Sequence, residues 1–88
     1  MAQKERLRMR EYTFTAVFEP EPGGGYTVHF PALRGCITSG ETLGETRHMA
    51  REALELYLES LIEDGLPIPE DSSAQPLREP IRVQLKPA

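Results

Sequence analysis

The sequence contains no tryptophan and no asparagine, and it has a single cysteine in 88 residues. One cysteine cannot form a disulfide within the chain, which argues against a small secreted scaffold held by disulfides. No apolar run approaches the roughly 20 residues that cross a bilayer, and the first residues lack the apolar core of a signal peptide. We therefore expect a cytoplasmic protein without membrane contact.

Positive charge is also scarce, with ten Lys and Arg against fourteen Asp and Glu and a net charge of -4. Proteins that wrap nucleic acid carry an excess of basic residues, so this balance argues against that class and favours a basic partner. The length allows one domain, 1–88, because domains usually run from about 50 to 250 residues. The basic residues near the start predict a flexible lead-in at 1–8.

Three short segments predict an antiparallel sheet. Residues 12–18 (YTFTAVF) and 26–30 (YTVHF) alternate between the two faces of a strand, which is typical of strands with one buried face. The glycines and prolines of 19–25 predict a reversal between them, so the two runs form a hairpin. Residues 31–35 predict a second turn, and CITSG at 36–40 predicts a third strand.

The period changes after residue 40 and predicts a helix that begins near Leu43. Thr42 and Glu45 have the spacing of a capping box, and Gly65 has the position of the residue that follows a helix end. Apolar side chains recur every three or four residues and form one stripe toward the sheet, namely Leu43, Ala50, Leu54, Tyr57, Leu58 and Leu61.

The remaining residues predict a loop and a last strand. Four prolines lie within 66–80, which indicates a long loop. IRVQL at 81–85 alternates again, and we expect Ile81, Val83 and Leu85 to face inward. The predicted fold is therefore α+β, with a mostly antiparallel sheet in the order β-β-β-α-β and the helix packed on one sheet face.

A tighter pattern occupies residues 26–42. It consists of an aromatic-led strand, a Pro-x-Leu-x-Gly-Cys turn, a Thr-x-Gly step and a threonine at the helix cap, at Tyr26, Phe30, Pro31, Leu33, Gly35, Cys36, Thr38, Gly40 and Thr42. This pattern resembles the N-terminal domain of the HicB-like antitoxin family. The resemblance extends over about residues 12–71.

The resemblance implies a partial ribonuclease-H-like fold and self-association as a dimer or larger. It also implies that the chain neutralises a small basic toxin, which cleaves messenger RNA, by occluding it. Full-length members commonly carry a C-terminal DNA-binding segment. Only three residues follow Leu85, so we expect this segment to be missing and expect no direct DNA binding.

No catalytic, cofactor or metal site is predicted. Ribonuclease H chemistry needs carboxylates that converge on two metal ions, typically with one in the middle of the first strand, where this chain has FTA at 14–16. His29, Cys36 and His48 are spaced too widely for a compact zinc site. A metal-dependent nuclease is thus the remote alternative. The nearer alternative is a stand-alone oligomeric structural or regulatory module without a toxin.

A second face of the predicted helix is a candidate partner surface. Its glutamates project within about 80° of one another and form an acidic ridge of Glu52, Glu55, Glu59 and Glu63. A solvated face is the simpler interpretation, whereas the sharper one is contact with a basic partner. Beside the ridge lie two apolar side chains, Met49 and Leu56. We expect either the 66–80 loop or a second subunit to cover them. An unpaired hairpin edge is the other candidate for self-association.

Overall fold

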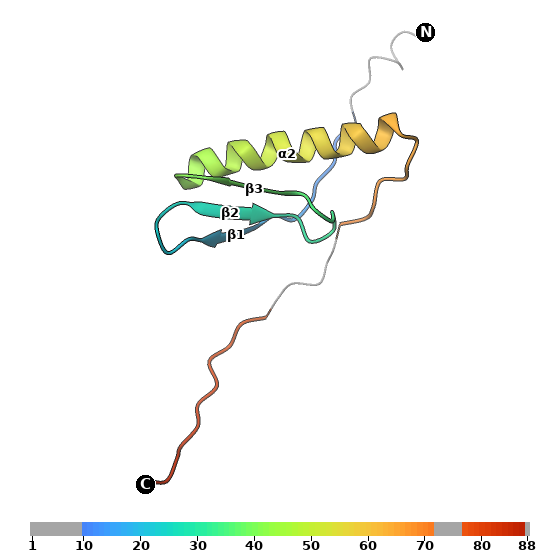
Figure 1. Cartoon of the computed structure of the whole chain (residues 1–88). Helices are drawn as coiled ribbons and strands as arrows, with labels where there is room; N and C mark the ends of the chain where they lie inside the picture. The colour runs from blue at the N-terminus through green and yellow to red at the C-terminus, as the bar shows by residue number, and fades with distance from the viewer. Residues whose placement is uncertain (1–9, 72–76, 88) are drawn as a thin grey trace, which may run out of the picture.

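The computed structural model describes residues 10–71 and 77–87, and it shows a three-stranded sheet with one helix on one of its faces (Figure 1). The sheet is antiparallel in the order β1-β2-β3. The elements are β1 Val17–Pro20, β2 Tyr26–His29, β3 Ile37–Gly40 and α2 Leu43–Glu63. The expected α+β class is confirmed. The lead-in expected at 1–8 lies outside the described residues.

Strand β1 lies later in the sequence than predicted. It includes Glu19 and Pro20, which the sequence assigned to a turn, while residues 12–16 belong to no strand. The cause is the partner strand. Val17 pairs with His29, the last residue of β2, and the chain then turns, with the Phe30 N–H donating to the Cys36 carbonyl, so the residues before Val17 have no strand of the described chain to pair with.

The expected inward face of this segment is nevertheless present. Phe14, Ala16 and Phe18 pack against the buried core, as their alternation predicted. That core lies between the sheet and the helix, and the helical stripe contributes Ala50 and Leu58 to it with Leu54, Tyr57 and Leu61 packed around them. The buried apolar residues are Val28, Phe30, Leu33, Cys36, Ala50 and Leu58.

Both ends of α2 follow the predicted signals. At the start, Thr42 Oγ1 accepts a hydrogen bond from the Glu45 backbone N–H at 3.1 Å. After the end, Gly65 adopts φ +67°, and the Leu66 N–H donates to the Leu61 carbonyl at 2.9 Å. These bonds satisfy helix-end groups that would otherwise lack partners. The helix therefore begins and ends where its caps place it.

The start of the helix lies unusually close to the end of β3. A Cβ added to Gly40 would lie 2.7 Å from Thr46 Oγ1 and 2.8 Å from Thr46 N, which is too short for any side chain. Thr46 is itself fully buried, and its hydroxyl donates to the Thr42 carbonyl at 2.7 Å. Gly40 is thus required for the packing of α2 on the sheet.

The predicted fourth strand is absent from this single chain. Residues 77–87, which we call the C-terminal arm, pair with no strand of the described chain and extend away from the sheet and helix (Figure 1). Ile81, Val83 and Leu85 are 76%, 71% and 86% exposed instead of facing inward. A strand needs a neighbouring backbone and a surface that covers its apolar face. The arm has neither here, so its alternation produces no strand.

Candidate functional site

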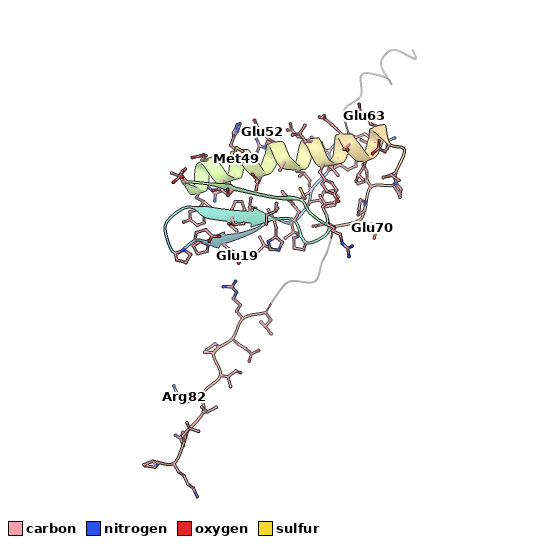
Figure 2. The ribbon with its side chains drawn as sticks, viewed as in Figure 1. Glu19, Met49, Glu52, Glu63, Glu70 and Arg82 are labelled. Carbon is pink, nitrogen blue, oxygen red and sulfur yellow. The ribbon has the colours of Figure 1, made fainter. Side chains whose placement is uncertain are left out.

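The acidic ridge lies on the outer surface of α2. Figure 2 shows Glu52 and Glu63 on the side of the helix that faces away from the sheet. All four ridge glutamates are exposed. His48 Nε2 lies 3.2 Å from Glu52 Oε1, while no ion pair joins the other three to a residue within 10–71 or 77–87. The ridge therefore presents mostly uncompensated negative charge to solvent.

An apolar flank borders this ridge. Leu56 is 67% exposed, and Met49 is half-buried. Residues 66–71 and 77–80, the described part of the 66–80 loop, do not cover Leu56. A single exposed leucine is ordinary on a protein surface, so this flank is a candidate contact only in combination with the acidic ridge.

The motif at 26–42 contributes mainly to the core, the strands and the turns of the domain, and not to the acidic ridge. Leu33 and Val28 are among its fully buried side chains, and Phe30 and Cys36 are nearly so. The turn that contains Gly35 is fastened to the helix by Tyr57, whose hydroxyl donates to the Arg34 carbonyl at 2.9 Å. The remaining motif residues form strands, turns and the helix cap already described, at Tyr26, Pro31, Thr38, Gly40 and Thr42.

Cys36 lies one residue before β3, which begins at Ile37 and not at the predicted residue 36, and it is buried against the helix. Its Sγ donates weakly to the Ala53 carbonyl at 3.8 Å, and burial raises the pKa of the thiol. A raised pKa disfavours the thiolate, which is the form that attacks or ligates. Within the described ranges, no three His, Cys, Asp or Glu side chains gather where they could hold a metal ion.

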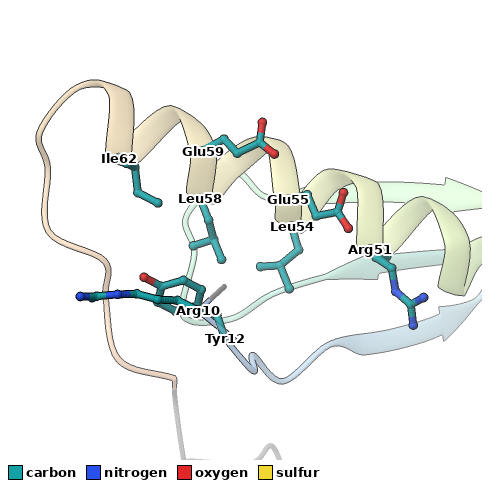
Figure 3. A pocket seen from close by; sticks show the side chains of 8 residues that line it. All are labelled: Arg10, Tyr12, Arg51, Leu54, Glu55, Leu58, Glu59 and Ile62. Atoms are coloured by element: carbon teal, nitrogen blue, oxygen red, sulfur yellow. The ribbon is translucent and has the colours of Figure 1, made fainter. Parts of the chain in front are cut away.

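A groove that the sequence did not predict runs along α2 next to the acidic ridge, and Glu55 and Glu59 of the ridge are among its lining residues. It has a volume of about 750 Å³ and an apolar floor of Tyr12, Leu54, Leu58 and Ile62. In Figure 3 the three helical side chains point toward the segment that carries Tyr12, and Glu55 and Glu59 lie above them. One residue could have predicted this groove from the sequence. Ile62 is apolar and follows Leu58 by one helical turn, yet it lies outside the predicted stripe toward the sheet.

The loop after the helix is tied to the segment that precedes β1. Asp71 accepts two hydrogen bonds from Thr15, one from the backbone N–H at 2.9 Å and one from the hydroxyl at 2.7 Å. These bonds bring residues separated by 56 positions into contact. They also fix the point at which the chain leaves the folded body toward the C-terminal arm.

These features define a class: a small α+β domain with an exposed acidic ridge and an apolar groove. No helix in the described part of the chain has the length and apolar character to cross a membrane. A family model described as the HicB-like antitoxin of bacterial toxin-antitoxin systems matches residues 14–82. The chain therefore belongs to the HicB-like antitoxin family.

Individual relatives agree with this assignment. A UPF0150 protein of Synechocystis sp. is 43% identical over 67 residues, which cover 75% of this chain and 85% of that protein. A UPF0150 protein of Thermoplasma acidophilum is 36% identical over 70% of this chain and 90% of its own length. Antitoxin HicB 1 of Photorhabdus laumondii is 34% identical over 73% of this chain, but the match covers only 41% of that protein.

Proposed function

We propose that the chain is a non-enzymatic antitoxin-type binding domain that neutralises a small basic, messenger-RNA-cleaving toxin by covering its surface. Family membership over residues 14–82 and the relation to Antitoxin HicB 1 support the antitoxin role. The exposed acidic ridge beside Leu56 is the observation that carries the binding mode. It offers a basic protein both opposite charge and an apolar contact.

The mechanism is steric occlusion, guided by charge. Opposite charges speed encounter and fix orientation, while apolar contact at the centre of an interface slows dissociation. No bond of the toxin is made or broken, so the toxin is released intact when the antitoxin is removed. The proposal includes a partial ribonuclease-H-like fold and a cytoplasmic site of action, where messenger RNA is translated.

Self-association as a dimer or larger belongs to the same proposal. A domain of this size buries a smaller fraction of its surface than a large domain does, and a second subunit adds stability that one chain lacks. Direct DNA contact is not included, because the net charge of -4 opposes it.

The test uses a small basic protein encoded beside this gene and a cell-free translation assay. Replacing Glu55→Lys and Glu59→Lys together should weaken rescue of translation, with association slowed roughly tenfold at low salt and less at high salt. The matched control is Glu41→Lys with Glu70→Lys, which changes net charge equally at exposed sites outside the ridge. Equal loss in both pairs would show that the ridge is not the binding surface.

The second candidate is a stand-alone oligomeric module with no toxin. It is favoured by the short UPF0150 relatives, whose names mention no toxin. An isolated gene and a stable homo-oligomer that inhibits no basic toxin would favour this second hypothesis. Metal-dependent RNA cleavage that survives purification, and that disappears when one carboxylate is replaced, would instead revive the nuclease alternative.

A further inference from the structure

The C-terminal arm carries the pattern of a strand without the surroundings of one. Ile81, Val83 and Leu85 occupy alternate positions and are each more than two-thirds exposed. Alternate side chains of an extended segment point to one face, so the three form a single apolar strip. The family match extends to residue 82 and thus includes the start of this strip. Of the three strip residues, Ile81 is thus within the matched domain, and no surface of the described chain covers the strip.

The sheet and helix, which we call the folded body, lack a strand partner from the described residues on the β1 side. β1 is an edge strand, with β2 on one side and no strand of the described chain on the other. Residues 12–16, which precede it, also have no strand partner among the described residues. The apolar groove of Tyr12, Leu54, Leu58 and Ile62 opens beside this segment (Figure 3). The Thr15 N–H already donates to Asp71, but the segment pairs with no strand of the described chain, and an unpaired edge next to an apolar groove is a template for one added strand.

We propose that two copies of this chain exchange their C-terminal arms, with residues 81–85 of each copy forming an added strand in the groove of the other. Ile81, Val83 and Leu85 cover the groove floor, and Arg82 and Gln84 remain in solvent. Each exchange satisfies an unpaired edge and buries an exposed apolar strip. A two-fold pair makes both exchanges at once, so the interface is closed and does not propagate into a fibre.

The occupant is a second copy because the body already fixes where its own arm departs. Asp71 binds Thr15 with two hydrogen bonds at the segment that precedes β1. Residues 77–87 of the arm extend away from the sheet and the helix of their own body (Figure 1). The arm can reach a neighbouring molecule without breaking the Asp71 anchor. The inference specifies the surface for self-association, and it does not depend on toxin binding.

The first test compares neighbouring positions by light scattering at micromolar concentration. The unaltered chain should have twice the mass of one chain. Val83→Lys should weaken dimerisation by about a hundredfold or more, because it places a charge on the groove floor. Gln84→Lys is the matched control on the outward face and should leave the dimer unchanged. A monomeric unaltered chain, or equal effects at 83 and 84, would overturn the proposal.

The second comparison is made on the helix. Ile62 and Leu56 are both exposed in one chain, at 57% and 67%, but only Ile62 lines the groove. Ile62→Lys should therefore give a monomer and Leu56→Lys a dimer, while circular dichroism shows both folded. The reverse result would place the interface on the flank of the acidic ridge and overturn arm exchange.

Mixing the two monomeric variants separates exchange between copies from folding back within one chain. The Val83→Lys chain retains an intact groove, and the Ile62→Lys chain retains an intact arm. Their mixture should form a heterodimer with one intact exchange, although each variant alone is monomeric. Because both substitutions add positive charge, attraction between the new side chains cannot produce this result. Failure of the mixture to associate would overturn the proposal, whatever the outcome of the toxin assay.

Discussion

Residues 26–30 and 81–85 have the same alternating pattern of apolar side chains, but only the first segment contains a strand. In 26–30, Val28 and Phe30 are buried between neighbouring strands and the helix. In 81–85, the equivalent apolar residues are exposed, and the backbone has no strand partner in the described chain. Alternation therefore specifies which face of a segment will be buried, but a neighbouring edge decides whether it becomes a strand.

The comparison also separates groups that are paired or buried within one chain from groups that stay exposed. The body has capped helix ends, a closed hairpin and a filled core. The arm, the groove and the acidic ridge expose apolar or charged groups that no described residue of the chain covers. We infer that the body is the scaffold and that these three features are the contact surfaces.

The largest expected effect contrasts one leucine from each region. Leu33 is 1% exposed, so Leu33→Ala should lower the free energy of unfolding by about 2–5 kcal/mol through lost burial and a cavity. Leu85 is 86% exposed, so Leu85→Ala should change it by less than about 0.5 kcal/mol. Urea unfolding at concentrations where the chain is monomeric measures both. Similar losses would show that the arm packs on its own body.

A smaller effect compares two glycines near the start of α2. Gly40→Ala should destabilise the fold by about 1–3 kcal/mol, because the new Cβ meets Thr46 and pushes the helix from β3. Gly44→Ala meets nothing within 4 Å and lies in the helix, so it should stabilise by about 0.5–1 kcal/mol. Thermal unfolding reports both signs. A neutral Gly40→Ala would contradict the close helix-sheet contact.

The smallest expected effect is on the pH dependence of stability. Burial raises the pKa of the Cys36 thiol, so the folded state holds this proton to higher pH than the unfolded state. Stability should be unaffected below the usual thiol range near about 8.5 and should fall as pH rises through the raised pKa. Cys36→Ala should abolish this fall. A thiol placed in the arm by Val83→Cys, in the Cys36→Ala background, should react with iodoacetamide faster than Cys36 does.

Local signals in the sequence were sufficient to predict the helix and its two ends. Thr42 and Gly65 cap α2 as expected, because capping depends on a few adjacent residues. The stripe toward the sheet was also predictable, since helical periodicity fixes which residues share a face. The ends of β1 were not, because they depend on how far β2 extends beside it.

The groove and the state of the arm depend on contacts between distant residues. Tyr12 and Ile62 line the same groove only because the segment before β1 passes below α2. The arm has the right alternation for a strand, but no local feature of 81–85 tells whether an edge is within reach. The acidic ridge was predicted by helical spacing alone; its four glutamates are exposed, and contact with a partner stays a prediction.

The central claim is that the body is complete in one chain and the arm is completed by a second. Amide hydrogen exchange at several protein concentrations tests this claim most directly. The amide of Val28 should stay protected at every concentration, while those of Arg82 and Val83 should gain protection as dimers form. Arm amides that stay unprotected in a dimer, or that are equally protected in a monomer, would contradict the claim.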